Sequence, residues 1–182
     1  MRRLLHFTLL ASLGALACAT VRVSTDYDPT AKFGSYKSYA WLPENPTPTG
    51  HPRLDSPLVQ ERIKKAIDQA LEAKGFARTE TPDFLVRYDL SAERRLDVTT
   101  YDSGFYRGYG YRMSLPVTEV REYDEGSLIV DILDYHEKQV VWRGVGQGRL
   151  RSEGASVDPA EQQQRIDKAV AAVLADFPPK PK

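Results

Sequence analysis

The residue types that most often do chemistry are scarce in this chain of 182 residues, which has one cysteine and three histidines. His6 lies in an apolar N-terminal stretch, His51 in a proline-rich segment and His136 between two expected strands. None of them has a cysteine or a second histidine at the spacing of metal ligands. A nucleophile–histidine–acid triad needs a base that a third group holds in place, which is not expected of a loop histidine. The sequence therefore predicts solvated histidines, no metal site and no cofactor.

Carboxylates are the other candidates for catalysis, and Asp131 stands out because it falls within the apolar run SLIVDILDY. On a two-residue period it shares a strand face with Ile129 and Leu133, where an ionised group is costly unless it is paired. Arg87 or Arg143, in neighbouring strands, would supply the partner. A tuned acid or a ligand contact is the functional alternative for a buried Asp131, but we favour a cross-strand ion pair or an exposed sheet face.

An aromatic segment is the best candidate for a binding surface. Residues 102–113 read DSGFYRGYGYRM and interleave aromatic rings with glycines and arginines. Tyrosine and arginine are enriched at recognition surfaces, so the segment is suited to stacking on glycan rings or docking a protein. A loop without a partner, or a strand whose rings cover a sheet edge, is the alternative. The candidate surface consists of Tyr101, Phe105, Tyr106, Arg107, Tyr109 and Tyr111.

The single cysteine follows a stretch that is typical of a secretory signal peptide. Residues 1–17 combine two arginines with an apolar run and end in small residues. The run is shorter than the roughly 20 apolar residues of a spanning helix. Cys18, in the sequence ALAC, resembles the lipidated cysteine of bacterial lipoproteins, although the leucine stands two places before the cysteine, not three. We expect residues 18–20 to form a lipidated N-terminus.

A soluble periplasmic chain, cleaved after residue 17 or 19, is the alternative to lipidation. It would leave a free thiol in an oxidising compartment, which is a liability. The acylated form therefore explains the cysteine better.

The overall composition excludes several classes of protein. Hydrophobic residues make up 41% and charged residues 27%, as in ordinary globular chains. The formal net charge is zero, so the basic field that nucleic-acid binding needs is missing. The length suits one domain with its own core, which we place at residues 21–179, followed by a tail at 180–182.

Two amphipathic helices and several strands must position these residues. Capping residues followed by proline, with apolar residues at three- and four-residue steps, predict helices at 57–74 and 159–177. Alternating segments predict strands at 21–27, 36–42, 84–101, 117–123, 127–135 and 139–150, the last two as a hairpin. Residues 43–57 are expected to form a proline-rich loop, and residues 124–126 a turn.

This order of elements predicts an α+β fold, a mainly antiparallel sheet with two helices packed on one face. Gly144, Gly146 and Gly148 fall on alternate residues of the last strand. They leave one strand face without side chains, so another element is expected to pack closely there.

Several motifs in fixed order resemble those of a known family. They are DYDP at 26–29, YAWLP at 39–43, KGF at 74–76, PDFLV at 82–86, YDEGSLIVD at 123–131 and VWRG at 141–144. With this spacing, the chain from about residue 20 to 179 resembles a family of bacterial envelope lipoproteins, domain of unknown function 4136. The resemblance implies a secreted, lipid-anchored domain and brings no catalytic residues.

We therefore expect a non-catalytic lipoprotein of the bacterial cell envelope that acts as a binding or assembly module. The expected partners are the membrane, through the N-terminal lipid, and an envelope protein or glycan, but no nucleic acid. The chain would face the periplasm, and Ala19 after the cysteine favours the outer membrane by resemblance to lipoprotein sorting. A periplasmic carrier of a lipid or apolar ligand, and a hydrolase using Asp131 or the pair Asp26 and Asp28, are the alternatives.

Overall fold

The computed structural model describes residues 21–43, 46–107, 111–151, 156 and 158–180, and for 104–107 and 111–115 it describes the backbone alone. The expected signal peptide and Cys18 lie outside the described residues, as does Tyr109 of the candidate surface. Among the described residues, no helix has both the length and the hydropathy of a membrane-spanning segment.

A six-stranded sheet forms one layer of the fold, with the strand order β1-β6-β5-β4-β2-β3. The strands are β1 (Arg22–Tyr27), β2 (Ser38–Trp41), β3 (Ala77–Arg78), β4 (Phe84–Arg107), β5 (Tyr111–Asp134) and β6 (Val140–Arg149). The pairs β1–β6, β6–β5 and β5–β4 are antiparallel, whereas β2 pairs in parallel with both β3 and β4. A short 3-10 helix, Phe33–Ser35, precedes β2.

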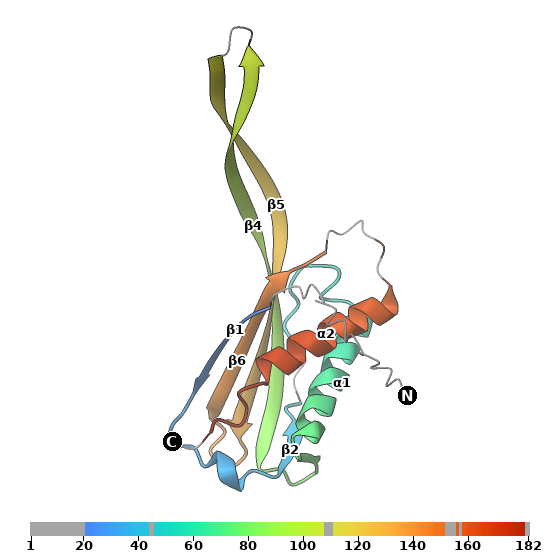
Figure 1. Ribbon diagram of the computed structural model, residues 1–182. Coiled ribbons are helices and arrows are strands. Elements are labelled where there is room, and N and C mark those ends of the chain that lie inside the picture. The colour runs from blue at the N-terminus through green and yellow to red at the C-terminus, as the bar shows by residue number, and fades with distance from the viewer. Residues whose placement is uncertain (1–20, 44–45, 108–110, 152–155, 157, 181–182) are drawn as a thin grey trace, which may run out of the picture.

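Two helices form the second layer and cover the same face of the sheet (Figure 1). α1 (Pro57–Ala73) follows Ser56 and begins with a proline, which suits a first turn because its missing N–H has no partner there anyway. α2 (Pro159–Val173) begins after Asp158, whose carboxylate accepts a hydrogen bond from the Ala160 N–H at 3.2 Å. The predicted α+β fold with helices on one face is confirmed.

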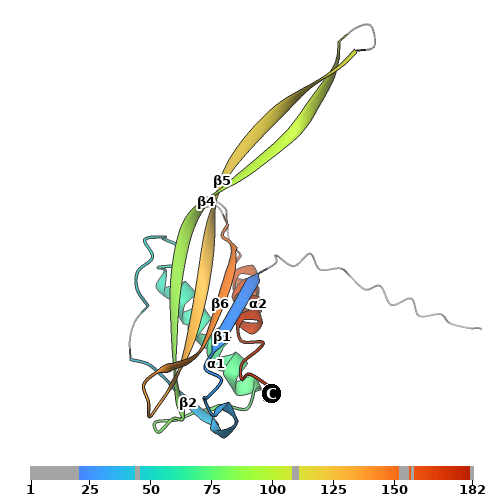
Figure 2. The same ribbon diagram turned by 90° about the vertical axis from the view of Figure 1, so that its left-hand side faces the viewer.

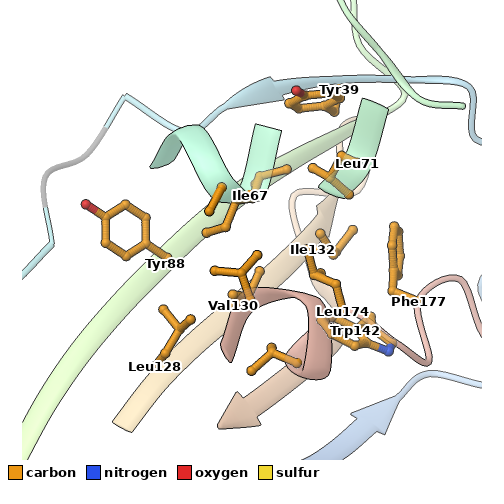
Figure 3. Packing of buried hydrophobic residues seen from close by; sticks show 14 of the residues in the cluster. Tyr39, Ile67, Leu71, Tyr88, Leu128, Val130, Ile132, Trp142, Leu174 and Phe177 are labelled. Atoms are coloured by element: carbon orange, nitrogen blue, oxygen red, sulfur yellow. The ribbon is translucent and has the colours of Figure 1, made fainter. Parts of the chain in front are cut away.

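The hydrophobic core fills the space between these layers (Figure 3). Even-numbered residues of β4 and β5, such as Val86 and Ile132, project towards the helices because side chains alternate between the faces of a strand. Ile67 and Leu71 of α1 meet them, and Phe177 closes the core after α2. These five side chains are at most 1% exposed, so large side chains occupy the layer in which a carrier would need its cavity.

Two of the three alternate glycines in β6 allow α2 to lie close to the sheet. A Cβ atom built on Gly146 would lie 2.5 Å from a methyl of Val173, and one on Gly144 would lie 2.8 Å from the other methyl of the same valine. The predicted close approach is therefore confirmed at these positions. Gly148 has no neighbouring atom within 4 Å of such a Cβ, so the prediction is wrong there.

The structure corrects the predicted course of the chain between residues 101 and 127. The segments 117–123 and 127–135 belong to one strand, β5, and the expected turn at 124–126 is absent. Much of the expected insert at 102–113 also continues β4 and β5. Sequence alternation is weak there because neither face of this part of the hairpin is covered by another layer, so no apolar period marks the strands.

The proline-rich loop also differs from expectation, because it buries His51, which is 8% exposed. The backbone N–H groups of Thr49 and Gly50 both donate to the Asp55 carboxylate at 2.8 Å, and this folds the loop back towards the sheet. His136, in contrast, is exposed at the turn between β5 and β6, as the sequence predicts.

Candidate interaction surface on a hairpin arm

β4 and β5 pair residue for residue along their whole length. β6 stays beside β5 only as far as Glu125, which lies opposite Arg149, and β2 stays beside β4 only as far as Val86. Beyond these neighbours the hairpin continues as a two-stranded ribbon made of residues 93–107 and 111–125, which we call the arm. Figures 1 and 2 show the arm projecting from the rest of the fold, the body, and twisting along its length.

One face of the arm, which we call the apolar face, consists of Leu96, Val98, Thr100, Thr118, Val120 and Glu122. These residues share a face because cross-strand partners project on the same side of a sheet. Leu96, Val98 and Val120 are 61%, 59% and 56% exposed. The hydroxyls of Thr100 and Thr118 lie 3.1 Å apart and hydrogen-bond to each other across the strands. The apolar face therefore presents three large aliphatic side chains to solvent.

The opposite face of the arm, which we call the charged face, consists of Arg95, Asp97, Thr99, Tyr101, Val117, Glu119, Arg121 and Tyr123. Arg121 Nε donates to Glu119 Oε1 at 2.7 Å. Tyr101, from the candidate surface, lies opposite Val117 and is 49% exposed.

The remaining candidate residues lie farther out along the same hairpin. Phe105, Tyr106 and Arg107 continue β4, and Tyr111 begins β5. Their backbones pair across the two strands, Arg107 opposite Tyr111. The described residues of the sequence-based surface therefore lie in the outer part of the arm, and the ribbon below them is formed by the strands that the sequence predicts at 84–101 and 117–123. The sequence does not predict that these two strands pair as one continuous hairpin.

Glu125 joins the arm to the body and is only 6% exposed. Arg22 of β1 donates a hydrogen bond to its Oε1, and Arg95 Nε lies 3.3 Å from its Oε2. The Arg149 guanidinium lies over the Tyr123 ring, 4.3 Å from the ring centroid. Sequence reasoning misses Glu125 because it places a turn there. Glu125 and Asp131 are six residues apart and so share a strand face. Extending the two-residue alternation of 127–135 back to residue 125 is the signal that would identify Glu125.

A shallow hollow of about 350 Å³ lies at the junction between the arm and the proline-rich loop; its lining residues include His51, Arg94 and Asp124. His51 Nε2 is 3.8 Å from Asp124 Oδ2, and Arg94 Nε is 3.8 Å from Asp124 Oδ1. The loop thus lies against the base of the arm at His51, while Arg94 and Asp124 face each other across the two strands of the arm.

Asp131 lies in the body and is 1% exposed. Arg143 donates to its two oxygens at 2.6 and 2.9 Å, and Arg87 donates to Oδ2 at 2.6 Å. Burial is the largest single influence on the pKa of Asp131 and raises it, but the hydrogen bonds and charges of Arg143 and Arg87 together outweigh burial and hold the pKa below its usual 3.8. Arg87 and Arg143, the two alternative partners that the sequence suggests, thus bind Asp131 at the same time. The carboxylate is ionised and fully occupied by these contacts.

The other carboxylates singled out in the sequence do not form a cluster with Asp131. Asp26 is exposed on β1, opposite Arg143. Asp28 accepts hydrogen bonds from the Thr30 hydroxyl and N–H at 2.7 and 2.8 Å, which lower its pKa. Among the described residues, no group of three or more histidine, cysteine and acidic side chains is arranged to hold a metal ion.

The fold and this surface together define an α+β domain whose sheet is covered by two helices and extended by a hairpin arm. The chain belongs to the family described as domain of unknown function DUF4136, whose family model matches residues 23–179. No curated protein matches it.

Solved structures resemble the chain only distantly. A PDZ domain protein from Parabacteroides distasonis is 14% identical with a TM-score of 0.47 over 87% of this chain, which spans only 35% of that protein. A PelC dodecamer from Paraburkholderia phytofirmans is 14% identical with a TM-score of 0.47 over 86% of this chain and 96% of its own. A putative neuraminyllactose-binding hemagglutinin homolog from Helicobacter pylori is 13% identical with a TM-score of 0.41 over 81% and 88%. The function must therefore be argued from the chain's own residues.

Proposed function

We propose that the chain is a non-catalytic module of the bacterial cell envelope, anchored by a lipid on Cys18, that binds or assembles an envelope partner through its arm. The observation that carries this proposal is the arm itself, in which fourteen cross-strand pairs, from Arg94–Asp124 to Arg107–Tyr111, extend beyond the neighbouring strands. A two-stranded ribbon is marginally stable alone in water, and its open edges invite further pairing. A partner that covers the arm would remove both disadvantages.

The chemistry of the arm fits an envelope protein or a glycan as the partner. Exposed strand edges accept an added strand through backbone hydrogen bonds. Tyr101, with Val117 beside it, offers an exposed ring close to the aromatic outer segment, and such rings stack on sugars or pack against protein side chains. The candidate surface of the sequence analysis is thus the recognition element that we propose.

Two features support the non-catalytic part of the proposal. The Asp131 carboxylate is committed to Arg87 and Arg143, and Asp28 is committed to Thr30. Neither group is left to act as an acid, a base or a nucleophile. His51 and His136 lie in separate loops, so they do not combine with these carboxylates.

The anchoring part of the proposal rests on the lone cysteine and its signal-like context. Acyl chains on Cys18 would hold the chain firmly, since each buried CH₂ contributes about 0.8 kcal/mol. We place the module at the periplasmic side, with the outer membrane favoured.

A photo-crosslinking amino acid in place of Tyr101 tests the recognition element in intact cells. We expect a crosslinked adduct from this position. We expect none from the same group in place of Leu58, which is also apolar and exposed but lies on α1. The adduct should be lost when Tyr106→Ala and Tyr109→Ala are added. An adduct that is unchanged by these two substitutions, or that forms equally well from position 58, would contradict the proposed surface.

A further inference from the structure

The chain enters the fold at the base of the arm. β1 begins at Arg22, opposite Gln147 of β6, and the Arg22 side chain donates to Glu125, the residue that joins arm and body. Cys18 precedes Arg22 by four residues, which span at most about 14 Å even when fully extended. A lipid on Cys18 would therefore hold the bilayer surface close to the base of the arm.

The arm leaves the body at this point and projects obliquely away from it (Figures 1 and 2). The nine β4–β5 pairs from Phe84 to Ala92 lie within the body and give it a length of about 30 Å along the strands. The fifteen pairs of the arm extend about 50 Å away from the body. The hairpin is thus an elongated rod tethered between its two ends.

Such a short tether restricts the orientation of the hairpin relative to the bilayer. The tether is too short to pass around the body and place the membrane beyond its far end, so the arm cannot stand away from the bilayer. The tether is also too short to leave room for the arm between body and bilayer. The arm must lie along the membrane or enter it.

Entry into the hydrocarbon is excluded by the chemistry of the ribbon. Its two outer edges carry backbone N–H and C=O groups without strand partners, each of which costs several kcal/mol in lipid. Asp97, Glu119 and Arg121 would add buried charges. The arm is therefore expected to lie on the bilayer surface.

The two faces of the arm differ in polarity, as expected of a ribbon that lies on a bilayer surface. The charged face contains Asp97, Glu119 and Arg121, whereas the apolar face presents Leu96, Val98 and Val120 with more than half of each side chain exposed. Apolar side chains at this depth enter the boundary between headgroups and acyl chains. We propose, on the basis of the Cys18 anchor in the proposed function, that the apolar face of the arm contacts the lipid bilayer surface and directs the charged face and Tyr101 towards the partner.

Fluorophore labelling of single introduced cysteines tests this contact. The full chain would be purified from membranes and reconstituted into vesicles of phosphatidylethanolamine and phosphatidylglycerol with a quencher-bearing lipid. Val98→Cys and Val120→Cys place an environment-sensitive label on the apolar face, and Thr99→Cys and Glu119→Cys place it one residue away on the charged face. Glu137→Cys, at the far end of the body, is the distant control. Acylation blocks the thiol of Cys18, so each label has one site.

We expect a blue shift and loss of emission at positions 98 and 120, with much smaller changes at 99, 119 and 137. An acylated chain with equal or no quenching on both faces would overturn the inference and leave the anchor standing. Self-quenching between labelled copies without lipid quenching would overturn it in favour of a second copy. The intact mass of the same sample reports acylation separately. If the mass shows no acylation, Cys18→Ser is added before labelling so that each label again has one site; quenching at 98 and 120 would then support the contact, while the mass refutes the anchor.

Discussion

Buried carboxylates on the sheet face opposite the helices are each held by two arginines. Asp131 lies between Arg87 and Arg143, and Glu125 lies between Arg22 and Arg95. In both cases the acid is nearly inaccessible while its partners are partly exposed. Because the carboxylates come from one strand and the arginines from its neighbours or from β1, these pairs fix the register of the open face.

Asp131→Asn should lower the free energy of unfolding by roughly 1–3 kcal/mol, because it leaves three charge-assisted hydrogen bonds from Arg87 and Arg143 without their acceptor charge. Asp89→Asn is the matched control on the same face. Asp89 makes one longer contact, 3.5 Å, with Arg87 and is a third exposed, so its loss should cost about 0.5 kcal/mol or less. Chemical denaturation of both variants measures the difference, and equal effects would show that the buried position has no special role.

The destabilisation caused by Asp131→Asn should itself depend on pH. The pKa of Asp131 lies below 3.8 in the folded chain and near 3.8 in the unfolded chain. The ionised group therefore stabilises the fold above that pH, and this contribution is lost as the pH falls through the folded-state pKa. The stability gap between the wild type and Asp131→Asn should be constant at neutral pH and shrink in acid. A gap that widens as the pH falls would contradict the ion-pair account.

At the level of elements, the contact between α2 and β6 depends on the absence of two side chains. Gly144→Ala and Gly146→Ala should each destabilise the fold by about 1–3 kcal/mol, because the added methyl overlaps Trp142 and Val173 at position 144 and Val173 at position 146. Gly148→Ala, two residues farther along the same strand, has open space and should change stability by about 0.5 kcal/mol or less. Thermal unfolding of the three variants checks the contrast. Equal destabilisation by all three would point to strand propensity instead of packing.

The two helices and the β5–β6 hairpin could be predicted from the sequence because each buries one face and so carries a clear apolar period. The partners of Asp131 could be predicted for the same reason, from alternation in a strand with known neighbours. The strands at 84–101 and 117–123 could also be predicted, but not their continuation into one arm, because residues 102–116 carry no clear apolar period. Pro116 and the glycines near it also suggest a break, yet a ribbon with open outer edges tolerates proline.

The position of Glu125 and the burial of His51 could not be predicted because both depend on segments distant in sequence. Glu125 is covered by Arg22, which is 103 residues away. His51 is buried only because its loop folds against the base of the arm, near Asp124.

At the level of the whole molecule, the arm and the body are separable in energetic terms. The core residues lie in β2, β4, β5, β6, the helices and the segments next to them, and the core cluster contains no residue from 93–125. Replacing residues 96–122 by an Asn-Gly turn, which keeps Arg95 beside Glu125 and Asp124 beside His51, should therefore leave a folded body. We expect the unfolding free energy to change by about 1 kcal/mol or less, from the loss of partly exposed ion pairs. Circular dichroism and thermal unfolding check this, and a shortened chain that fails to fold would show that the arm is part of the core structure.

The same shortened chain should keep its anchor and lose its partner, whereas Cys18→Ser should keep its arm and leave the membrane. Carbonate washing of membranes separates the two cases. We expect the shortened chain in the pellet and the Cys18→Ser chain in the supernatant. Retention of Cys18→Ser in the pellet would mean that the arm, and not the lipid, supplies the main attachment.

The intact mass of the chain purified from membranes tests the central claim most directly, because it reports cleavage and acylation in one measurement. The lipid-anchored module predicts a chain that begins at Cys18 and carries the added mass of its acyl groups. A mass that begins at Met1, or one that corresponds to cleavage after residue 17 or 19 without added lipid, would contradict it.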